Sequence, residues 1–258
     1  NNTMLIQSYI NLKKNINSLK KKFGLVGIKA EFEAEGSANT DISRLKILSN
    51  ELNTQLHVKI GGVEAKNDIY NCIELGVDGI IAPMVETEFG LIKFIDTINN
   101  LKLNKKPFLS INLETITAYN NFEKILFRCM GNIQNITIGR SDLSSSIMNK
   151  KIDQNSEEIT EIILSVGKRL KNKNIKLTVG GGINKRSIEI FKKKKIWSVV
   201  DKLETRKIIL DTKSMLKNGA LNECINFETN YIINKKDIYN LKIRDEIKRL
   251  LDLKSRKK

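Results

Sequence analysis

Residues 108–115 read Phe-Leu-Ser-Ile-Asn-Leu-Glu-Thr, and residues 133–144 read Ile-Gln-Asn-Ile-Thr-Ile-Gly-Arg-Ser-Asp-Leu-Ser. Each stretch is a short, largely apolar run that ends in polar residues and is followed by a helical pattern. Similar runs lie on both sides, at 25–28, 55–60, 79–82, 176–179, 197–200 and 208–210. Strands that alternate with helices form right-handed βαβ units and a parallel sheet. About eight such runs favour a closed (β/α)8 TIM barrel of the α/β class, with an open doubly wound sheet as the alternative.

The segments outside these runs predict helices. Residues 4–22 place apolar side chains at three- and four-residue intervals, and a second amphipathic pattern covers 237–253. No proline- or glycine-rich linker divides the 258 residues, of which 40% are apolar, enough for one full-sized core. We therefore expect a single barrel domain over 1–258, with a leading helix at 1–22 and a C-terminal helical extension at 212–258.

Composition narrows the class of partner. The formal charge of +16 would suit nucleic acid, but the lysines are scattered and no aromatic residues interleave with them, so we expect solvated helix faces and no nucleic-acid partner. Cys72, Cys129 and Cys224 lack zinc-site spacing and are expected to be reduced thiols. No apolar run approaches roughly 18 residues and no signal-peptide pattern is present, so we expect a cytoplasmic protein without a membrane partner.

Two carboxylates stand where a barrel carries its chemistry. Catalytic groups of a βα barrel come from the carboxyl ends of its strands, and Glu114 and Asp142 follow two successive runs. Adjacent strands lie about 4.8 Å apart, close enough for both carboxylates to bind one hard cation. The pair predicts a magnesium site that leaves positions for water and substrate. Taken singly, Asp142 would equally cap the next helix, and Glu114 would sit in a first turn.

Positive and glycine-rich residues at the same strand ends are candidates for binding an anionic substrate. Lys59, Arg140 and Arg206 could hold a carboxylate or a developing enolate, or form surface ion pairs. The backbone amides at Gly180 and Gly181 could cradle an anion, although a tight turn explains these glycines nearly as well.

The first run leads into three glutamates, and the only histidine lies inside the second run. Period-two alternation would aim Glu31, Glu33 and Glu35 in the same direction. His57 is expected to be a packed residue rather than a general base, because it lies within a strand. This pattern argues against a Ser-His-Asp triad.

Four segments together resemble the HpcH/HpaI aldolase and citrate lyase beta-subunit family of metal-dependent lyases, within the phosphoenolpyruvate/pyruvate barrel superfamily. They are Gly-Gly-Val-Glu-Ala at 61–65, Ala-Pro-Met-Val-Glu-Thr at 82–87, Ile-Asn-Leu-Glu-Thr at 111–115, and Ile-Gly-Arg-Ser-Asp-Leu-Ser at 138–144. The resemblance covers about 25–210, and the last two segments are the most specific. It implies that Glu114 and Asp142 hold magnesium or manganese.

The sequence departs from that family at two positions. The family's arginine after the second strand, which binds the keto-acid carboxylate, corresponds to Lys59. Lysine keeps the charge but cannot bind a carboxylate through two parallel hydrogen bonds as arginine does. The family's histidine after the first strand, which acts as the general base, is replaced by the stretch that holds Glu31, Glu33 and Glu35. One of these glutamates, with Glu33 as the candidate, is then expected to transfer the proton, while Lys59 or Arg140 stabilises the negative oxygen.

The resemblance implies a divalent-metal-dependent carbon–carbon lyase or aldolase that acts on a 2-oxo acid or related carboxylate through a metal-stabilised enolate. The residues expected to bind that substrate are Lys59, Glu31, Glu35, Gly180, Gly181 and Arg206. A catalytically degenerate barrel that binds a carboxylate or phosphorylated ligand without turnover is the alternative, because the histidine is missing. The family also implies a homo-oligomer formed through the C-terminal helices.

Overall fold

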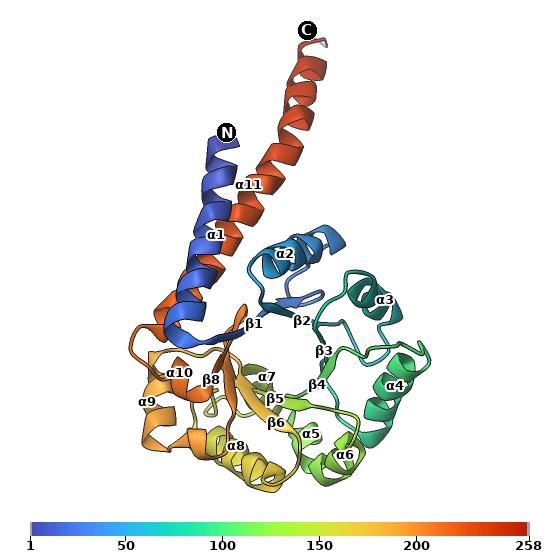
Figure 1. The fold of residues 1–258 in the computed structure, drawn as a ribbon, viewed down its shortest axis with the longest axis vertical. Coiled ribbons are helices and arrows are strands. Elements are labelled where there is room, and N and C mark those ends of the chain that lie inside the picture. The colour runs from blue at the N-terminus through green and yellow to red at the C-terminus, as the bar shows by residue number, and fades with distance from the viewer. Residues whose placement is uncertain (1, 257–258) are drawn as a thin grey trace.

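The computed structural model describes residues 2–256 as a closed eight-stranded barrel surrounded by helices, from which two helices project (Figure 1). The predicted α/β barrel is therefore confirmed. The strands are β1 (Leu25–Glu31), β2 (Gln55–Lys59), β3 (Gly79–Ala82), β4 (Phe108–Leu113), β5 (Asn135–Gly139), β6 (Lys176–Gly180), β7 (Lys202–Glu204) and β8 (Ile208–Asp211). The helices are α1 (Asn2–Phe23), α2 (Asn39–Glu51), α3 (Lys66–Glu74), α4 (Glu88–Asn99), α5 (Ile116–Asn120), α6 (Phe122–Cys129), α7 (Arg140–Ser146), α8 (Glu157–Leu170), α9 (Lys185–Lys193), the 3-10 turn η1 (Ile196–Ser198), α10 (Thr212–Met215) and α11 (Ala220–Ser255).

The last part of the barrel differs from the predicted parallel arrangement. Strands β1 to β7 pair in parallel with their neighbours, but β8 is antiparallel to both β7 and β1. Only residues 205–207 separate β7 from β8, whereas a parallel return needs a crossover of about a dozen residues. The run at 197–200 was wrongly predicted to be a strand, because η1 and a turn occupy it and β7 begins at Lys202. The β7–β8 hairpin therefore closes the barrel.

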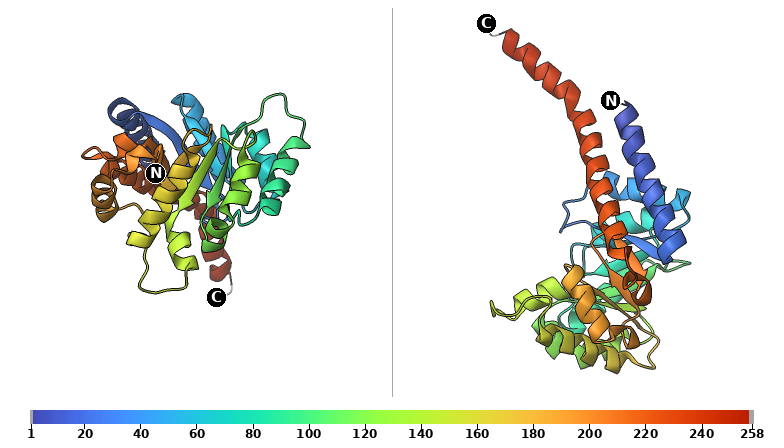
Figure 2. Two further views of the ribbon diagram at one scale, coloured as in Figure 1. Left: turned by 90° about the horizontal axis from the view of Figure 1, so that it is seen from below. Right: turned by 90° about the vertical axis from the view of Figure 1, so that its left-hand side faces the viewer.

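The barrel is apolar outside and polar inside. Helices cover the outside of the ring of strands (Figure 2), and the main core between them includes the three cysteines, which are buried. The cysteines are free, as predicted. Inside the ring, Asn135 on β5 donates to Ser110 Oγ on β4 at 2.8 Å and accepts from Thr178 Oγ1 on β6 at 2.8 Å. These hydrogen bonds satisfy polar groups that would otherwise be costly to bury. Because the lumen is polar, charged side chains can lie near the end of the barrel where the parallel strands finish.

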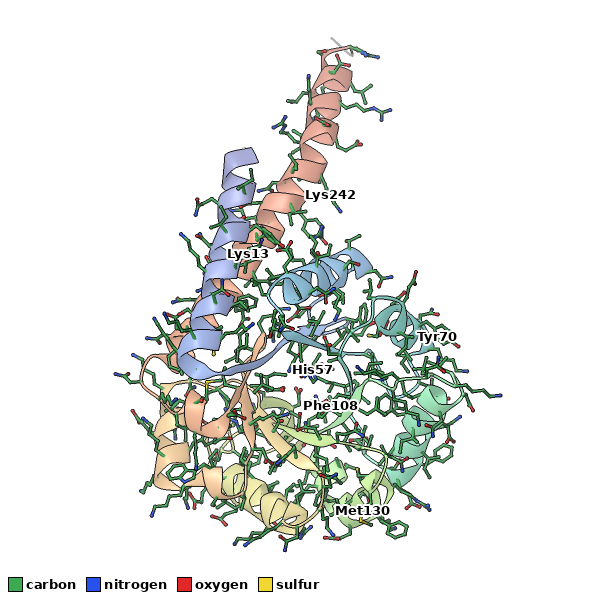
Figure 3. All side chains as sticks on the ribbon, viewed as in Figure 1. Lys13, His57, Tyr70, Phe108, Met130 and Lys242 are labelled. Carbon is green, nitrogen blue, oxygen red and sulfur yellow. The ribbon has the colours of Figure 1, made fainter. Side chains whose placement is uncertain are left out.

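His57 is a packed lumen residue, as predicted, and lies with Phe108 inside the ring of strands (Figure 3). The two rings meet edge to face with centroids 5.3 Å apart, and Nε2 lies 3.0 Å from Gln55 Oε1. Gly79 makes room for the imidazole, because a Cβ added there would lie 2.3 Å from Nδ1. Burial, assisted by the charge of Lys202, lowers the pKa of His57 from 6.5 to about 4.

The depressed pKa of His57 predicts acid sensitivity. The unfolded chain binds more protons at His57 than the folded chain as the pH falls from 6.5 to about 4. The stabilisation is complete above that window, and about 3 kcal/mol is lost across it. Urea unfolding near pH 7 and near pH 5 should show a smaller loss for His57→Gln than for the parent. Equal losses in the two proteins would show that another group controls the acid sensitivity.

The two projecting helices pack against each other and run in opposite directions (Figures 1 and 2). α1 buries the apolar stripe that contains Leu12, Ile16 and Leu19, and Asn234 of α11 donates to Ser8 Oγ at 2.9 Å. α11 has 36 residues, about 54 Å of helix, and extends past the N-terminal end of α1. The expected helices at both ends are present, although residues 1, 257 and 258 lie outside the described part. None of the helices described within 2–256 is long and apolar enough to span a bilayer.

Candidate active site

Charged side chains from separate strands meet at the carboxyl mouth of the barrel. Glu31 and Lys59 end β1 and β2, Glu114 follows β4, and Glu204 ends β7. Asp142 lies in the first turn of α7, directly after β5. The structure therefore brings both predicted metal ligands and the predicted substrate lysine to one end of the sheet. It adds Lys29 and Glu204, which the sequence reasoning missed.

Glu114 is a buried carboxylate with a defined orientation. Glu114 is only 3% exposed, and its Oε1 accepts a hydrogen bond from the Met84 N–H at 2.9 Å. Its Oε2 accepts from Asn112 Nδ2 at 3.0 Å. Burial is the largest influence on its pKa and raises it, while the Met84 amide and the charge of Lys59 act in the opposite direction and Asp142 adds to the rise. The carboxylate is thus held in place but lacks enough positive charge around it.

Gly139 provides the space in which the Glu114 carboxylate lies. Leu113 is in register with Ile138, so Glu114 and Gly139 follow at the same level of adjacent strands. A Cβ on Gly139 would lie 2.7 Å from Glu114 Oε2 and 3.0 Å from Glu114 Cβ. Such contacts are below van der Waals distance, and the φ of Gly139 is an ordinary −86°. The requirement for glycine here is therefore one of space rather than of backbone conformation.

The charge and donor types at the mouth fit a hard divalent cation. Four carboxylates face two ammonium groups there, which leaves two negative charges without a protein partner; the groups are Glu31, Glu114, Asp142, Glu204, Lys29 and Lys59. Neither Glu114 nor Asp142 forms an ion pair with another side chain among residues 6–256, whose side chains the structure describes. No three His, Cys, Asp or Glu side chains in that range gather into a metal-binding group. Two carboxylates agree with the usual protein contribution to a Mg²⁺ site.

Lys59 stands at the entrance of a buried chain of charges. Its Nζ lies 3.3 Å from Glu31 Oε2, and its side chain is 15% exposed. Glu31 Oε1 lies 3.1 Å from Lys29 Nζ, which is also 2.6 Å from Glu204 Oε1. Burial raises the pKa of Glu31, but the two lysines outweigh it and hold that pKa below its ordinary value. Glu31 is thus an ionised partner of Lys59 in this arrangement.

The expectation that the three glutamates point the same way is wrong. Strand β1 ends at Glu31, and the chain then turns, so the period-two alternation does not continue. Glu33 is exposed beside Gly61, while Glu35 forms an ion pair with the buried Lys207, which directly precedes β8. Lys207 Nζ also lies 4.2 Å from the centre of the Tyr231 ring on α11. Of the three glutamates, only Glu31 lies in the mouth beside Lys59.

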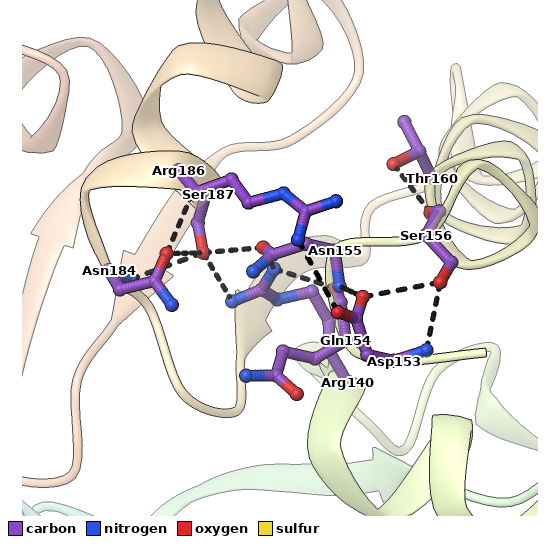
Figure 4. A network of polar contacts seen from close by, with 9 residues as sticks. All are labelled: Arg140, Asp153, Gln154, Asn155, Ser156, Thr160, Asn184, Arg186 and Ser187. Atoms are coloured by element: carbon purple, nitrogen blue, oxygen red, sulfur yellow. Dashed lines mark hydrogen bonds and ion pairs between the residues drawn. The ribbon is translucent and has the colours of Figure 1, made fainter. Parts of the chain in front are cut away.

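Arg140 occupies a structural position, contrary to the catalytic role predicted for it (Figure 4). Its Nε donates to Gly180 O at 3.0 Å, and its two terminal nitrogens donate to four further protein acceptors: Gln154 O, Asn155 Oδ1, Gly181 O and Ser187 Oγ. All five N–H groups are therefore used, and the residue is 1% exposed. Burial lowers the pKa of Arg140 to about 10, with Asp153 opposing, so the guanidinium stays charged at neutral pH.

The remaining predicted substrate residues lie at the same end of the barrel. The carbonyl groups of Gly180 and Gly181 accept from Arg140, and Gly181 has a φ of +80° that favours glycine. Both glycines thus have a local structural function, and an additional role of their amides in anion binding stays a prediction. Arg206 is exposed in the β7–β8 hairpin. Its substrate contact likewise stays a prediction.

Solved structures match this chain, although no family model and no curated protein matches its sequence. An HpcH/HpaI aldolase/citrate lyase family protein from Burkholderia cenocepacia matches with a TM-score of 0.56 and 10% identity, over 74% of this chain and 91% of that one. The chain shares the barrel fold of that protein. An HpcH/HpaI aldolase from Desulfitobacterium hafniense matches with a TM-score of 0.52 and 10% identity, over 73% and 88% of the two chains. At this identity the likeness establishes the fold, and the activity has to be argued from the site.

Proposed function

We propose that this chain is a divalent-metal-dependent carbon–carbon lyase or aldolase of the HpcH/HpaI type, acting on a 2-oxo acid or a related carboxylate. The observation that carries the proposal is the buried Glu114 carboxylate next to Asp142, at a mouth that lacks two positive charges. A carboxylate that is buried, oriented and without a cationic partner is costly unless a cation binds there. The fold of the two solved structures supports the same class of reaction.

In this proposal Glu114 and Asp142 hold Mg²⁺ or Mn²⁺. When bound, the metal would act as a Lewis acid toward the oxygens of the substrate. Lys59 binds the substrate carboxylate or the negative oxygen, because it is the partly exposed cation of the mouth. Glu33 faces solvent beside Gly61, and the two lysines hold the pKa of Glu31 below its ordinary value, so Glu31 orients Lys59 rather than receiving a proton. Arg140 fixes the turn that presents Asp142 and does not contact the substrate.

Metal-dependent turnover tests this function. A panel of 4-hydroxy-2-oxo carboxylates, and of 3-hydroxy carboxylates and their thioesters, would be assayed for release of pyruvate or an acetyl group, with Mn²⁺ or with EDTA. We expect release that EDTA abolishes and that Glu114→Gln lowers about 100-fold or more. Asp245→Asn removes an exposed carboxylate from distal α11 and should retain full activity. Absence of release across the panel would favour a barrel that binds its ligand without turnover.

We further propose that α11 joins copies of this chain into a homo-oligomer. Its distal part exposes Ile243, Ile247, Leu250, Leu251 and Leu253, each at least 44% accessible. Exposed apolar side chains on one element are typical of an interaction surface. Light scattering should give a mass above that of one chain, and Ile247→Asp with Leu251→Asp should reduce it to one chain. A parent that is already monomeric at assay concentrations would rule this out.

A further inference from the structure

Four charges, three of them buried, form a continuous chain across the lumen, from Glu204 through Lys29 and Glu31 to Lys59. The successive separations are 2.6 Å, 3.1 Å and 3.3 Å between the charged atoms. The first three residues are at most 7% exposed, so Lys59 is the member closest to solvent. The charges alternate in sign along the chain.

Lys29 is the centre of this chain. Burial acts most strongly on its pKa and lowers it, but the charges of Glu204 and Glu31 outweigh burial and raise the pKa above its ordinary value. A buried ammonium group needs such partners, since an unpaired charge in the protein interior costs several kcal/mol. Without Glu204, Glu31 would be the only carboxylate paired with Lys29. Glu31 would then be drawn away from Lys59.

Glu204 has a space made for it, as Glu114 does. A Cβ on Gly180 would lie 2.7 Å from Glu204 Cγ and 3.0 Å from its Oε1. Gly139 and Gly180 are in register on adjacent strands, so neighbouring glycines admit Glu114 and Glu204. The lumen is thus shaped to hold the Glu204 carboxylate at Lys29 rather than to accept it by chance.

Lys59 keeps donors available for a ligand. Among the side chains described, those of residues 6–256, the ion-pair partner of its Nζ is Glu31 Oε2, and an ammonium group has three N–H donors. Because Glu31 is itself fixed by Lys29, the direction of the free donors depends on the whole chain of charges. Small displacements of such a group are expected to weaken binding of a small, charged substrate.

We propose that Lys29 and Glu204 are positioning residues, which act through Glu31 to fix the Lys59 ammonium for a substrate carboxylate. The role of Lys59 in this inference rests on the proposed function. The positioning itself concerns only contacts within this chain. It predicts that the geometry of the Glu204 carboxylate, and not only its charge, controls Lys59.

Competitive acetylation of the metal-free protein tests the positioning directly. Acetic anhydride would be added in trace amounts at a fixed pH, and peptide mass spectrometry would give the rate at which Lys59 is acetylated. We expect Glu204→Gln to speed this acetylation about 10-fold and Lys29→Met to slow it, because Glu31 moves away from Lys59 in the first case and toward it in the second, and an ammonium group held by a carboxylate reacts more slowly. Glu204→Asp keeps the charge but is too short to reach Lys29, so it should speed the acetylation as Glu204→Gln does.

A second readout is oxalate binding in the presence of Mn²⁺, measured by calorimetry. Glu204→Gln and Glu204→Asp should weaken oxalate about 10-fold while Mn²⁺ affinity stays within about threefold of the parent. Lys202→Met, which removes a partly buried lysine on the same strand, should leave oxalate binding unchanged. A parent that does not bind Mn²⁺ would defeat the proposed function, and the acetylation would still decide the positioning. Parent-like Lys59 labelling in both Glu204 variants would overturn the inference.

Discussion

Arg140→Met is expected to lower the free energy of unfolding by about 3–5 kcal/mol. The substitution removes five hydrogen bonds and leaves the buried Gly180 O without its Arg140 donor. It also removes a guanidinium that stacks 4.9 Å from the centre of the Phe191 ring. Urea unfolding of the parent and the variant measures the difference.

The control is Arg140→Lys, which keeps the positive charge. A lysine cannot reproduce the planar fork that reaches five acceptors, so we expect most of the stability loss to remain. If Arg140 served mainly in catalysis, both variants would unfold like the parent and lose only activity. That result would restore the role predicted from the sequence and contradict the structural position of this side chain.

Gly139→Ala is expected to lower Mn²⁺ affinity about 100-fold, because the new methyl group would displace Glu114 from its space. The added Cβ would lie 2.7 Å from Glu114 Oε2, and Glu114 Cβ at 3.0 Å cannot swing away as a side-chain end could. The carboxylate would then leave the Met84 amide. Calorimetry with Mn²⁺ gives the affinity, and thermal unfolding shows how much stability is lost with it.

Gly62→Ala is the matched control for this substitution. Gly62 lies three residues beyond the end of β2, and a Cβ there would meet nothing within 4 Å. It should bind Mn²⁺ like the parent. Equal affinities for Gly139→Ala and the parent would mean that Glu114 is not a metal ligand or that the two strands separate easily.

The fold was predictable from the sequence because apolar runs alternate regularly with helical segments over most of the chain. The prediction failed where the regularity ends: β7 was misplaced, and the strand correctly predicted at 208–210 is antiparallel to its neighbours. Strand β7 has three residues, and the apolar run at 197–200 that was mistaken for it is occupied by the 3-10 turn η1 and the two residues after it. Ile196 and Val200 are buried there. A short apolar run can be a strand or a turn, and no periodic pattern marks a hairpin whose connecting loop has only three residues.

The site was predictable where a functional residue ends or directly follows a strand that was recognised, as Lys59, Glu114 and Asp142 do. Lys29 was missed because it lies inside β1, and Glu204 was missed because β7 was misplaced at 197–200. A signal for Lys29 was present, since alternation along β1 places Gly27, Lys29 and Glu31 on the same inward face. Arg140 was misinterpreted because its position in the sequence does not reveal the direction of its side chain, which the loop at 153–155 and α9 determine.

Calorimetric titration of Mn²⁺, with and without oxalate as an enolate mimic, tests the central claim most directly. The parent is compared with Glu114→Gln and Asp142→Asn, which are close in size to the native residues. We predict that the parent binds Mn²⁺, that oxalate binds only when Mn²⁺ is present, and that each variant loses metal binding. If the parent binds no metal, or if both variants bind it as the parent does, the carboxylates are structural and the lyase proposal is wrong.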